Sequence, residues 1–400
     1  MRRSRFFAVV SFILLAGSIL LPAAPALAQQ QPDPQAVYFP QTGHHLDNRY
    51  GFLDYWRANG QVLRFGYPLT EVVEEDGRPV QYFERARMEY HAEYAGTPWS
   101  ILLGLLSREI VGDRQFPVGA TVQGRIFPET GYTVFGKFLQ YWTKRGGLAV
   151  FGYPISESYV ETQPDGSTLA VQWFERARLE YHPGTVHPFF KERERANGTR
   201  IFTLYEILMG HLGSEAALRR GYVLDAVPRQ PGVPDWSPAL WPQRIEIDLS
   251  DQQLVAYEGD LPVWRAGTST GKDMFETPTG SFSVYGKLLY DDMTGDLQGE
   301  EYDVRKVPYV LYFHLGYAIH GTYWHDQFGT GVRRSHGCVN LSMDDAEWIW
   351  AWVQPAWVPE RAAHATNYEP LVPESAAEAE LQPMEGLAIF RRGTPVIVRE

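Results

Sequence analysis

The chain has 400 residues, with 36 basic and 48 acidic side chains and a formal net charge of −12. This acidity argues against a nucleic-acid partner, because phosphate binding needs a basic surface. Hydrophobic residues make up 44% of the chain, which suffices for packed cores, and the length predicts two or three domains.

Residues 1–28 have the pattern of an export signal. Three arginines form a basic start, a mostly apolar stretch follows, and Ala-Leu-Ala at 26–28 provides a cleavage site of small residues. Cleavage would remove three arginines and no acidic residue, so the net charge would change from −12 to −15. We expect an extracytoplasmic protein, secreted or associated with a bacterial cell wall. It would contact the membrane only if this segment stays uncleaved as an anchor.

The first half of the chain repeats one aromatic pattern. Five motifs recur in the same order, at spacings of 86 to 106 residues. The pairs are Phe39–Gly43 and Phe127–Gly131, Phe52–Trp56 and Phe138–Trp142, Phe65–Pro68 and Phe151–Pro154, Phe83–His91 and Phe174–His182, and Ile101–Gly104 and Ile207–Gly210. Insertions fall between the motifs, as loops do between packed elements. We predict two small α+β modules, at residues 37–126 and 127–222.

Each module is expected to contain a short helix around its Tyr-Trp pair, a Gly-Tyr-Pro turn, a small hairpin and an apolar helix. Asp-Gly pairs at 76–77 and 165–166 mark the two hairpin turns. The motifs resemble the LGFP-like repeats of exported bacterial proteins, and this resemblance implies contact with wall glycan. The simpler interpretation is that Trp56, Trp142 and the other aromatic residues form the core of each module.

Residues 223–243 are predicted to be a linker. Five prolines lie between positions 226 and 242, and proline at this density prevents regular structure and stiffens the chain. The composition then changes, which predicts that another domain begins at residue 244.

Residues 244–400 are predicted to form a β-rich, sandwich-like domain with one prominent helix. Ile245, Ile247 and Leu249 alternate with polar residues, as on a half-buried strand. Further strands are expected at 254–257, 261–266, 281–285, 309–313, 317–320 and 395–398. The helix begins at Ser342, and an insertion of unknown role occupies 354–392. The fold class is therefore multidomain α+β.

Cys338 is the only cysteine of the chain, within the segment Ser335–Asn340. Exported proteins usually use cysteines in pairs, so a single one indicates a chemical role or a buried structural residue. The thiolate is the reactive form, and an adjacent imidazole usually generates it. A zinc site formed by His320, His336 and Cys338 is a weaker alternative, since no fourth ligand is evident. Gly267–Lys272 lacks the spacing of a phosphate loop, and no cofactor is predicted.

Residues 244–353 and 393–399 closely resemble the L,D-transpeptidase (YkuD-like) catalytic domain. The motifs that carry the resemblance are Ile247–Leu254, Ser269–Gly271, Thr277–Phe282, Ala318–Gly321 and Ser335–Leu341. The resemblance implies that a Cys338 thioester forms on a peptidoglycan stem peptide, that a terminal D-amino acid leaves, and that an amine acceptor receives the acyl group.

The resemblance also implies roles for individual residues. Cys338 would be the nucleophile and His320 the base that forms its thiolate, with His336, Ser335 and Asn340 shaping the site. The backbone amides of Gly337 and Cys338 would face the developing oxyanion. Many family members have serine after the upstream histidine, and Gly321 keeps the carbonyl that orients the imidazole but lacks the hydroxyl.

Substrate contacts are expected from Trp324, Tyr302 and Arg334. The acidic segment 291–303 is expected to be a mobile lid over the acyl site. Two alternatives to a transpeptidase remain: an L,D-carboxypeptidase-type hydrolase that resolves the thioester with water, and a non-catalytic wall-binding protein.

Overall fold

The structure is a computed structural model that describes residues 34–119, 123–163, 166–182, 206–297, 299–353, 388–389 and 393–400. The expected export signal and most of the insertion at 354–392 lie outside these residues. Residues 34–400 belong to one compact unit with a β-rich, multidomain α+β fold, as predicted. None of the helices that the structure describes is long and apolar enough to cross a membrane.

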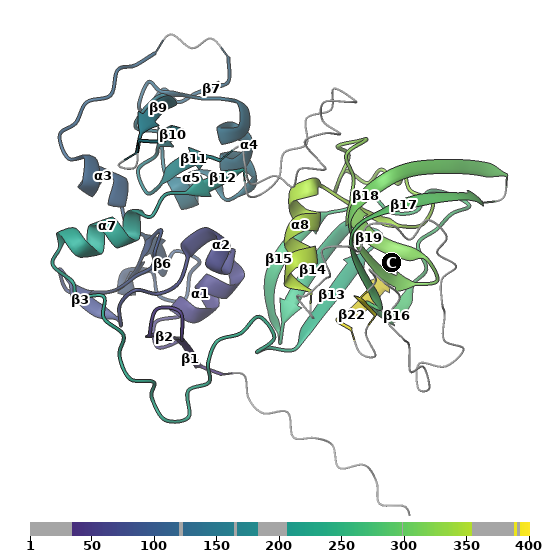
Figure 1. Ribbon diagram of the computed structural model, residues 1–400, viewed down its shortest axis with the longest axis horizontal. Coiled ribbons are helices and arrows are strands. Elements are labelled where there is room, and N and C mark those ends of the chain that lie inside the picture. Colours follow the sequence, from purple (N-terminus) through teal and green to yellow (C-terminus); the bar gives the residue numbers. More distant parts are fainter. Residues whose placement is uncertain are drawn as a thin grey trace, which may run out of the picture. The chain divides into compact units, whose positions relative to one another are not determined.

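The first repeat combines three short α-helices with a two-stranded and a four-stranded antiparallel sheet (Figure 1). Its elements are β1 (Ala36–Phe39), β2 (His44–Asp47), α1 (Phe52–Ala58), α2 (Gln61–Phe65), β3 (Val73–Glu75), β4 (Arg78–Tyr82), β5 (Arg87–Tyr90), η1 (Ala92–Tyr94), β6 (Ile101–Leu103) and α3 (Leu106–Val111). Trp56 is fully buried, and its Nε1 donates to the carbonyl of Gly66 over 3.0 Å. Gly66 has a φ of 76°, and a Cβ there would lie 2.2 Å from the Glu84 carboxylate, so this turn requires glycine.

The described elements of the second repeat follow the order of those in the first, without a counterpart of η1. They are β7 (Arg125–Ile126), β8 (Thr133–Val134), α4 (Gly136–Lys144), α5 (Gly147–Phe151), β9 (Tyr159–Thr162), β10 (Thr168–Trp173), β11 (Arg178–Tyr181), β12 (Ile207–Met209) and α7 (Leu212–Arg219). Trp142 is buried and donates to the Gly152 carbonyl over 3.2 Å, as Trp56 does in the first repeat. The interpretation of both tryptophans as core residues is confirmed.

The apolar run at the end of each module is a strand, and the expected helix begins only after it. Ile101 and Leu103 are buried while Leu102 is less so, which is the alternation of a strand. A run of three or four apolar residues carries too little periodicity to separate strand from helix in the sequence.

The two repeats contact each other reciprocally. Arg85 Nε donates to the Met209 carbonyl over 3.1 Å, and Arg176 Nε donates to the Leu103 carbonyl over 3.0 Å. Arg85 and Arg176 are equivalent in the repeat, as are Leu103 and Met209. Helices α3 and α7 pack in the same interface. The repeats are therefore joined by the same contact made twice.

The proline-rich linker has no regular structure, as predicted, but it packs against the first repeat. Trp236 stacks on Phe39, with ring centroids 5.3 Å apart and planes 19° apart. The backbone of Tyr38 accepts from Trp236 N–H over 2.7 Å and donates to the Pro234 carbonyl over 2.9 Å. The linker therefore continues the first repeat instead of acting as a free spacer.

The C-terminal region is a β-sandwich of two five-stranded sheets. One sheet contains β15 (Leu261–Gly267), β14 (Gln253–Glu258), β13 (Gln243–Asp248), β22 (Pro395–Arg399) and β16 (Gly280–Ser283), in that order. The other contains β20 (Val339–Leu341), β19 (Tyr317–Gly321), β18 (Glu300–His314), β17 (Gly286–Leu297) and β21 (Ala388–Ile389). The strands expected from alternation are present. Helix α8 (Met343–Trp352) begins at Ser342, whose Oγ accepts from Asp345 N–H over 3.2 Å.

The acidic segment that was expected to be a lid is part of a long regular hairpin. Strands β17 and β18 pair from Gly286↔Tyr312 to Leu297↔Glu300, and Figure 1 shows them running together beyond their neighbours. The alternation of charged residues with Met293, Tyr302 and Val304 fits a strand exposed on one face. Residues 291–303 therefore belong largely to two paired strands and not to a loop.

A buried ion pair joins helix α1 to the sandwich. Arg57 Nε lies 3.0 Å from Glu258 Oε2, and both side chains are 3% exposed. Glu258 also accepts from Gln61 Nε2 over 2.9 Å and from Trp352 Nε1 over 3.0 Å. Burying these charges is tolerable because the carboxylate is fully hydrogen-bonded.

Replacing Arg57 with methionine should lower the free energy of unfolding by about 3 kcal/mol, because the Glu258 carboxylate then stays buried without its cation. The double variant Arg57→Met/Glu258→Gln should recover much of this loss. Urea denaturation of the four proteins in the double-mutant cycle measures both effects. The control is Arg49→Met, at an exposed ion pair, which should change stability by less than about 0.5 kcal/mol. Equal effects of the two single arginine variants would contradict the prediction.

Candidate active site

The register of two parallel strands places Cys338 and His320 on the same face of the sheet. In β19 and β20 His320 pairs with Asn340 and Ile319 with Val339, and Cys338 directly precedes β20. Neighbouring strands lie about 4.8 Å apart, and residues two apart on a strand face the same side. Cys338 and Asn340 therefore share a face with His320. Among the described residues, no hydrogen bond joins the thiol to the imidazole.

His320 is held as a neutral base. It is 3% exposed, and its Nδ1 lies 3.1 Å from the Gly321 carbonyl oxygen. Since a carbonyl only accepts, Nδ1 carries the proton and Nε2 keeps a free lone pair. Burial lowers the pKa of His320 to about 4. The ring is therefore uncharged at neutral pH and able to accept a proton.

Tight packing explains glycine at position 321. A Cβ on Gly321 would lie 3.0 Å from Pro308 Cγ, 3.1 Å from Met343 Sδ and 3.3 Å from Ala346 Cβ. A serine side chain would force strand β18 and helix α8 apart. The carbonyl that orients His320 is kept without the side chain.

The Cys338 side chain is partly exposed, but its sulfur packs in an apolar environment. Its neighbours include Leu288, Val310 and Ala318. Burial raises the pKa of the thiol to about 11, and a hydrogen bond with the Ala318 backbone offsets this only in part. The resting site thus holds a neutral thiol beside a neutral imidazole. Desolvation disfavours the charged form of each group.

Backbone hydrogen bonds tie the Cys338 segment to the motif at residues 269–272. Ser269 and Asn340 exchange N–H and carbonyl groups over 3.0 Å in both directions. Lys272 N–H donates to the Ser335 carbonyl over 3.0 Å, and Ser335 N–H donates to the Thr270 carbonyl over 3.1 Å. Two motifs that are distant in the sequence therefore form one frame around the cysteine.

Thr277 connects a third motif to the same frame. Its Oγ1 donates to the Gly337 carbonyl over 2.7 Å and accepts from Gly271 N–H over 3.0 Å. Gly337 has a φ of 113°, and a Cβ there would lie 2.3 Å from Tyr317 Cε1. Only glycine fits between the Thr277 hydroxyl and the Tyr317 ring.

The turn before Cys338 occupies one of the two amides expected to face an oxyanion. Ser335 Oγ donates to the Cys338 carbonyl over 2.5 Å and accepts from Gly337 N–H over 3.0 Å. The Gly337 N–H is therefore engaged inside the turn. The Cys338 N–H has no hydrogen-bond acceptor among the described residues, and it remains available to an incoming oxygen.

His336 is engaged by the tip of the β17–β18 hairpin. Its ring stacks on Tyr302 at 5.4 Å and meets the edge of Phe275 at 4.9 Å. His336 Nε2 lies 2.9 Å from Glu300 Oε1, and Glu300 also pairs with Lys272. Hydrogen bonds from Lys272 and then from His336 lower the pKa of Glu300. The hairpin thus reaches over the cysteine segment and contacts the loop at 272.

His325 was not predicted, and it orients Asn340. Its Nδ1 accepts from Gln327 N–H over 3.2 Å, so the proton of the neutral ring lies on Nε2. The Asn340 amide nitrogen lies 3.1 Å from this Nε2, while Asn340 Oδ1 has no partner in the described part of the chain. Exchanging the amide oxygen and nitrogen lets Nε2–H donate to Oδ1 and satisfies both groups. In the sequence, the only sign of this role is that His325 directly follows Trp324, an expected substrate contact.

The three expected substrate-contact residues lie around the site. Trp324 is 42% exposed, with its ring 5.8 Å from that of His320. Tyr302 covers His336, and the exposed Arg334 side chain binds Gln327. Within the described residues, no group of three His, Cys, Asp or Glu side chains is placed to hold a metal ion.

Residues 242–398 match the L,D-transpeptidase catalytic domain (YkuD) family. The catalytic domain of the Enterococcus faecium (E. faecium) L,D-transpeptidase is 22% identical, with 39% of this chain and 96% of that chain covered and a TM-score of 0.28. An L,D-transpeptidase from Mycobacterium smegmatis is 16% identical, with 56% of this chain and 91% of that chain covered and a TM-score of 0.29. No curated protein matches the chain. The family match thus covers the C-terminal sandwich and does not extend to the two repeats.

The pKa of His320 predicts how stability depends on pH. The unfolded state binds this proton below about pH 6.5 and the folded state only below about pH 4. Between these values the unfolded state holds more protons, so stability falls as the pH falls, by about 3 kcal/mol over the window. Denaturant titrations from pH 7 to pH 4 should show this loss relative to His320→Gln. Parallel curves for the two proteins would contradict it.

Proposed function

We propose that the protein is an exported L,D-transpeptidase that acylates Cys338 with a peptidoglycan stem peptide. The observation that carries the proposal is the orientation of His320. Its Nδ1 is fixed by the Gly321 carbonyl, and its Nε2 is free on the strand next to Cys338. This is the arrangement that a general base for a neighbouring nucleophile requires.

In the proposed acylation, the thiol proton moves to His320 Nε2 as the sulfur attacks the carbonyl carbon before the terminal D-amino acid. The developing oxyanion accepts from the Cys338 N–H. The amide C–N bond then breaks, the imidazolium returns the proton to the leaving amine, and a thioester remains. Because both resting groups are neutral, proton transfer and sulfur attack are coupled.

In the second half-reaction an acceptor amine attacks the thioester. His320 takes a proton from this amine, the new amide forms, and the proton returns to the Cys338 sulfur as it leaves. The hairpin residues Glu300 and Tyr302 lie over the segment that holds the cysteine and reduce the access of water. This cover favours an amine acceptor over hydrolysis.

Incubation of the full chain with a defined disaccharide-tetrapeptide tests the proposal. We expect release of D-alanine together with cross-linked dimer, detected by mass spectrometry, and a loss of at least about 10³-fold for Cys338→Ala and for His320→Gln. The control is Leu218→Ala, at an exposed residue on α7 of the second repeat. Free D-alanine without dimer identifies a hydrolase, and an inert wild type that forms no acyl adduct with a carbapenem identifies a non-catalytic wall protein.

The same proposal assigns contact with wall glycan to the repeats. It is supported by two exposed aromatic side chains in the loop between β5 and β6, Trp99 at 55% and Tyr94 at 45% exposure. Aromatic faces of this kind stack on sugar rings, whereas the repeat tryptophans Trp56 and Trp142 are buried.

Retention on purified wall sacculi tests the role of these aromatic residues. The comparison uses Cys338→Ala protein, so that no covalent adduct contributes, with and without Trp99→Ala and Tyr94→Ala. Retention should fall about tenfold when both rings are removed, because each stacking contact contributes about 0.5–1.5 kcal/mol. Leu218→Ala, at an exposed apolar residue on α7, is the control. Undiminished retention of the double aromatic variant refutes this role.

A further inference from the structure

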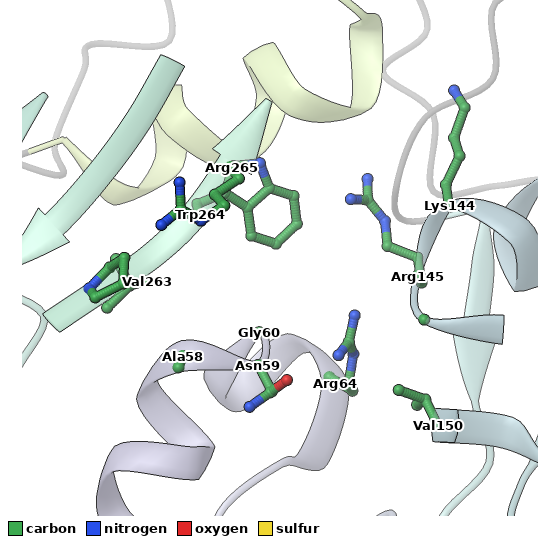
Figure 2. A pocket seen from close by; sticks show the side chains of 12 residues that line it. Ala58, Asn59, Gly60, Arg64, Lys144, Arg145, Val150, Val263, Trp264 and Arg265 are labelled. Carbon is green, nitrogen blue, oxygen red and sulfur yellow. The ribbon is translucent and has the colours of Figure 1, made fainter. Parts of the chain in front are cut away.

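A cationic cleft lies where the two repeats meet strand β15, away from Cys338. It has a volume of about 270 Å³. It is lined by the turn between α1 and α2, the equivalent turn between α4 and α5, and residues 262–265. Figure 2 shows the side chains of Arg64 and Arg145 directed into this space beside Trp264.

The duplication explains why the cations converge. The turn Ala58–Gly60 is equivalent to the turn Lys144–Gly146, and both glycines have left-handed φ values, 102° and 108°. The first repeat contributes Arg64 where the second has Val150, and the second contributes Lys144 and Arg145 where the first has Ala58 and Asn59. Charges from non-equivalent positions therefore meet in one cleft.

These cations are poorly compensated. Four basic side chains and no acidic one line the cleft; they are Arg64, Lys144, Arg145 and Arg265. Among the described residues the Arg64 side chain has no hydrogen-bond or ion-pair partner, and its guanidinium carbon lies 6.0 Å from the Phe65 ring centroid. Asp344 approaches Arg145 at 3.5 Å and Lys144 at 3.7 Å, and Asp345 approaches Arg145 at 3.8 Å. Two carboxylates at these distances leave an excess of positive charge.

The Arg145 side chain gives the strongest indication that the cleft binds a hydrogen-bond acceptor. It is only 6% exposed, and its Nε and Nη2 have no hydrogen-bond partner in the described part of the chain. Its guanidinium lies over Trp264, 4.7 Å from the ring centroid, which fixes its plane. A buried guanidinium with two unused donors is costly unless an acceptor fills the cleft. Burial and the nearby Arg145 charge also lower the pKa of Arg64.

We propose that this cleft binds an oxyanion, a carboxylate or phosphate group, between Arg64 and Arg145. Planar guanidinium groups match such oxygens in pairs, and a group held by both arginines would satisfy the unused donors of Arg145. Val150 and Val263 provide an apolar wall for the rest of the ligand. Since the lining comes from both repeats and β15, the bound anion stabilises their contact. The site is separate from the proposed chemistry at Cys338.

Calorimetric titration of the full chain with inorganic phosphate and, separately, with acetate tests the proposal and distinguishes the two ligand chemistries. Sodium chloride at equal ionic strength is the reference. We expect saturable binding of at least one probe. Its affinity should fall about tenfold or more in Arg64→Gln, and less in Arg64→Lys, which keeps the positive charge but lacks the paired N–H donors of the guanidinium. Arg219→Gln, at an exposed arginine on α7, should bind as the wild type does.

Thermal unfolding without added anion provides a second readout. The Arg64 side chain has no hydrogen-bond or ion-pair partner among the described residues, so Arg64→Gln should be at least as stable as the wild type. Only the wild type should gain stability when the probe is added. A purely structural arginine predicts the reverse, a destabilised variant. The proposal is overturned if the wild type binds neither probe, if Arg64→Gln binds equally well, or if the variant is less stable without anion.

Discussion

The reciprocal backbone hydrogen bonds between Ser269 and Asn340 are the contact on which the catalytic geometry depends. They fix the strand that follows Cys338 to a segment almost seventy residues earlier, and Thr277 adds a side-chain tie to Gly337. The cysteine is thus placed by main-chain groups, which have little freedom to rearrange. Motifs that look independent in the sequence each supply one part of this frame.

Burial acts on the two reactive groups in opposite directions. It raises the pKa of the Cys338 thiol and lowers that of the His320 imidazole, so the resting pair stays neutral. An ion pair in the empty site would face the desolvation of both charges. In the proposed mechanism, the charge separation becomes favourable only when a substrate carbonyl accepts the sulfur electrons and the Cys338 amide receives the oxyanion. A site that works in this way would protect its thiol from reaction until a substrate is present.

Local patterns predicted much of the fold, and long-range contacts limited the rest. Alternation located the sandwich strands, Ser342 marked the start of α8, and the motifs around His320 and Cys338 identified the candidate site. The engagement of Gly337 N–H by Ser335, the contact of Glu300 with His336 and the role of His325 were not predictable, because each depends on which segments meet. The packing of the linker against the first repeat was not predictable for the same reason. Its prolines were visible in the sequence, but the stacking of Trp236 on Phe39 was not.

The paired contacts of Arg85 with Met209 and of Arg176 with Leu103 have the form of an isologous interface, in which the same patch serves both partners. A lone copy of the module would leave one such patch uncovered and would need a second molecule to cover it. Fusion of two copies replaces that concentration-dependent association with an intramolecular one. The two halves are then free to diverge in sequence, as Arg64 and Val150 have done, while their mutual fit is retained.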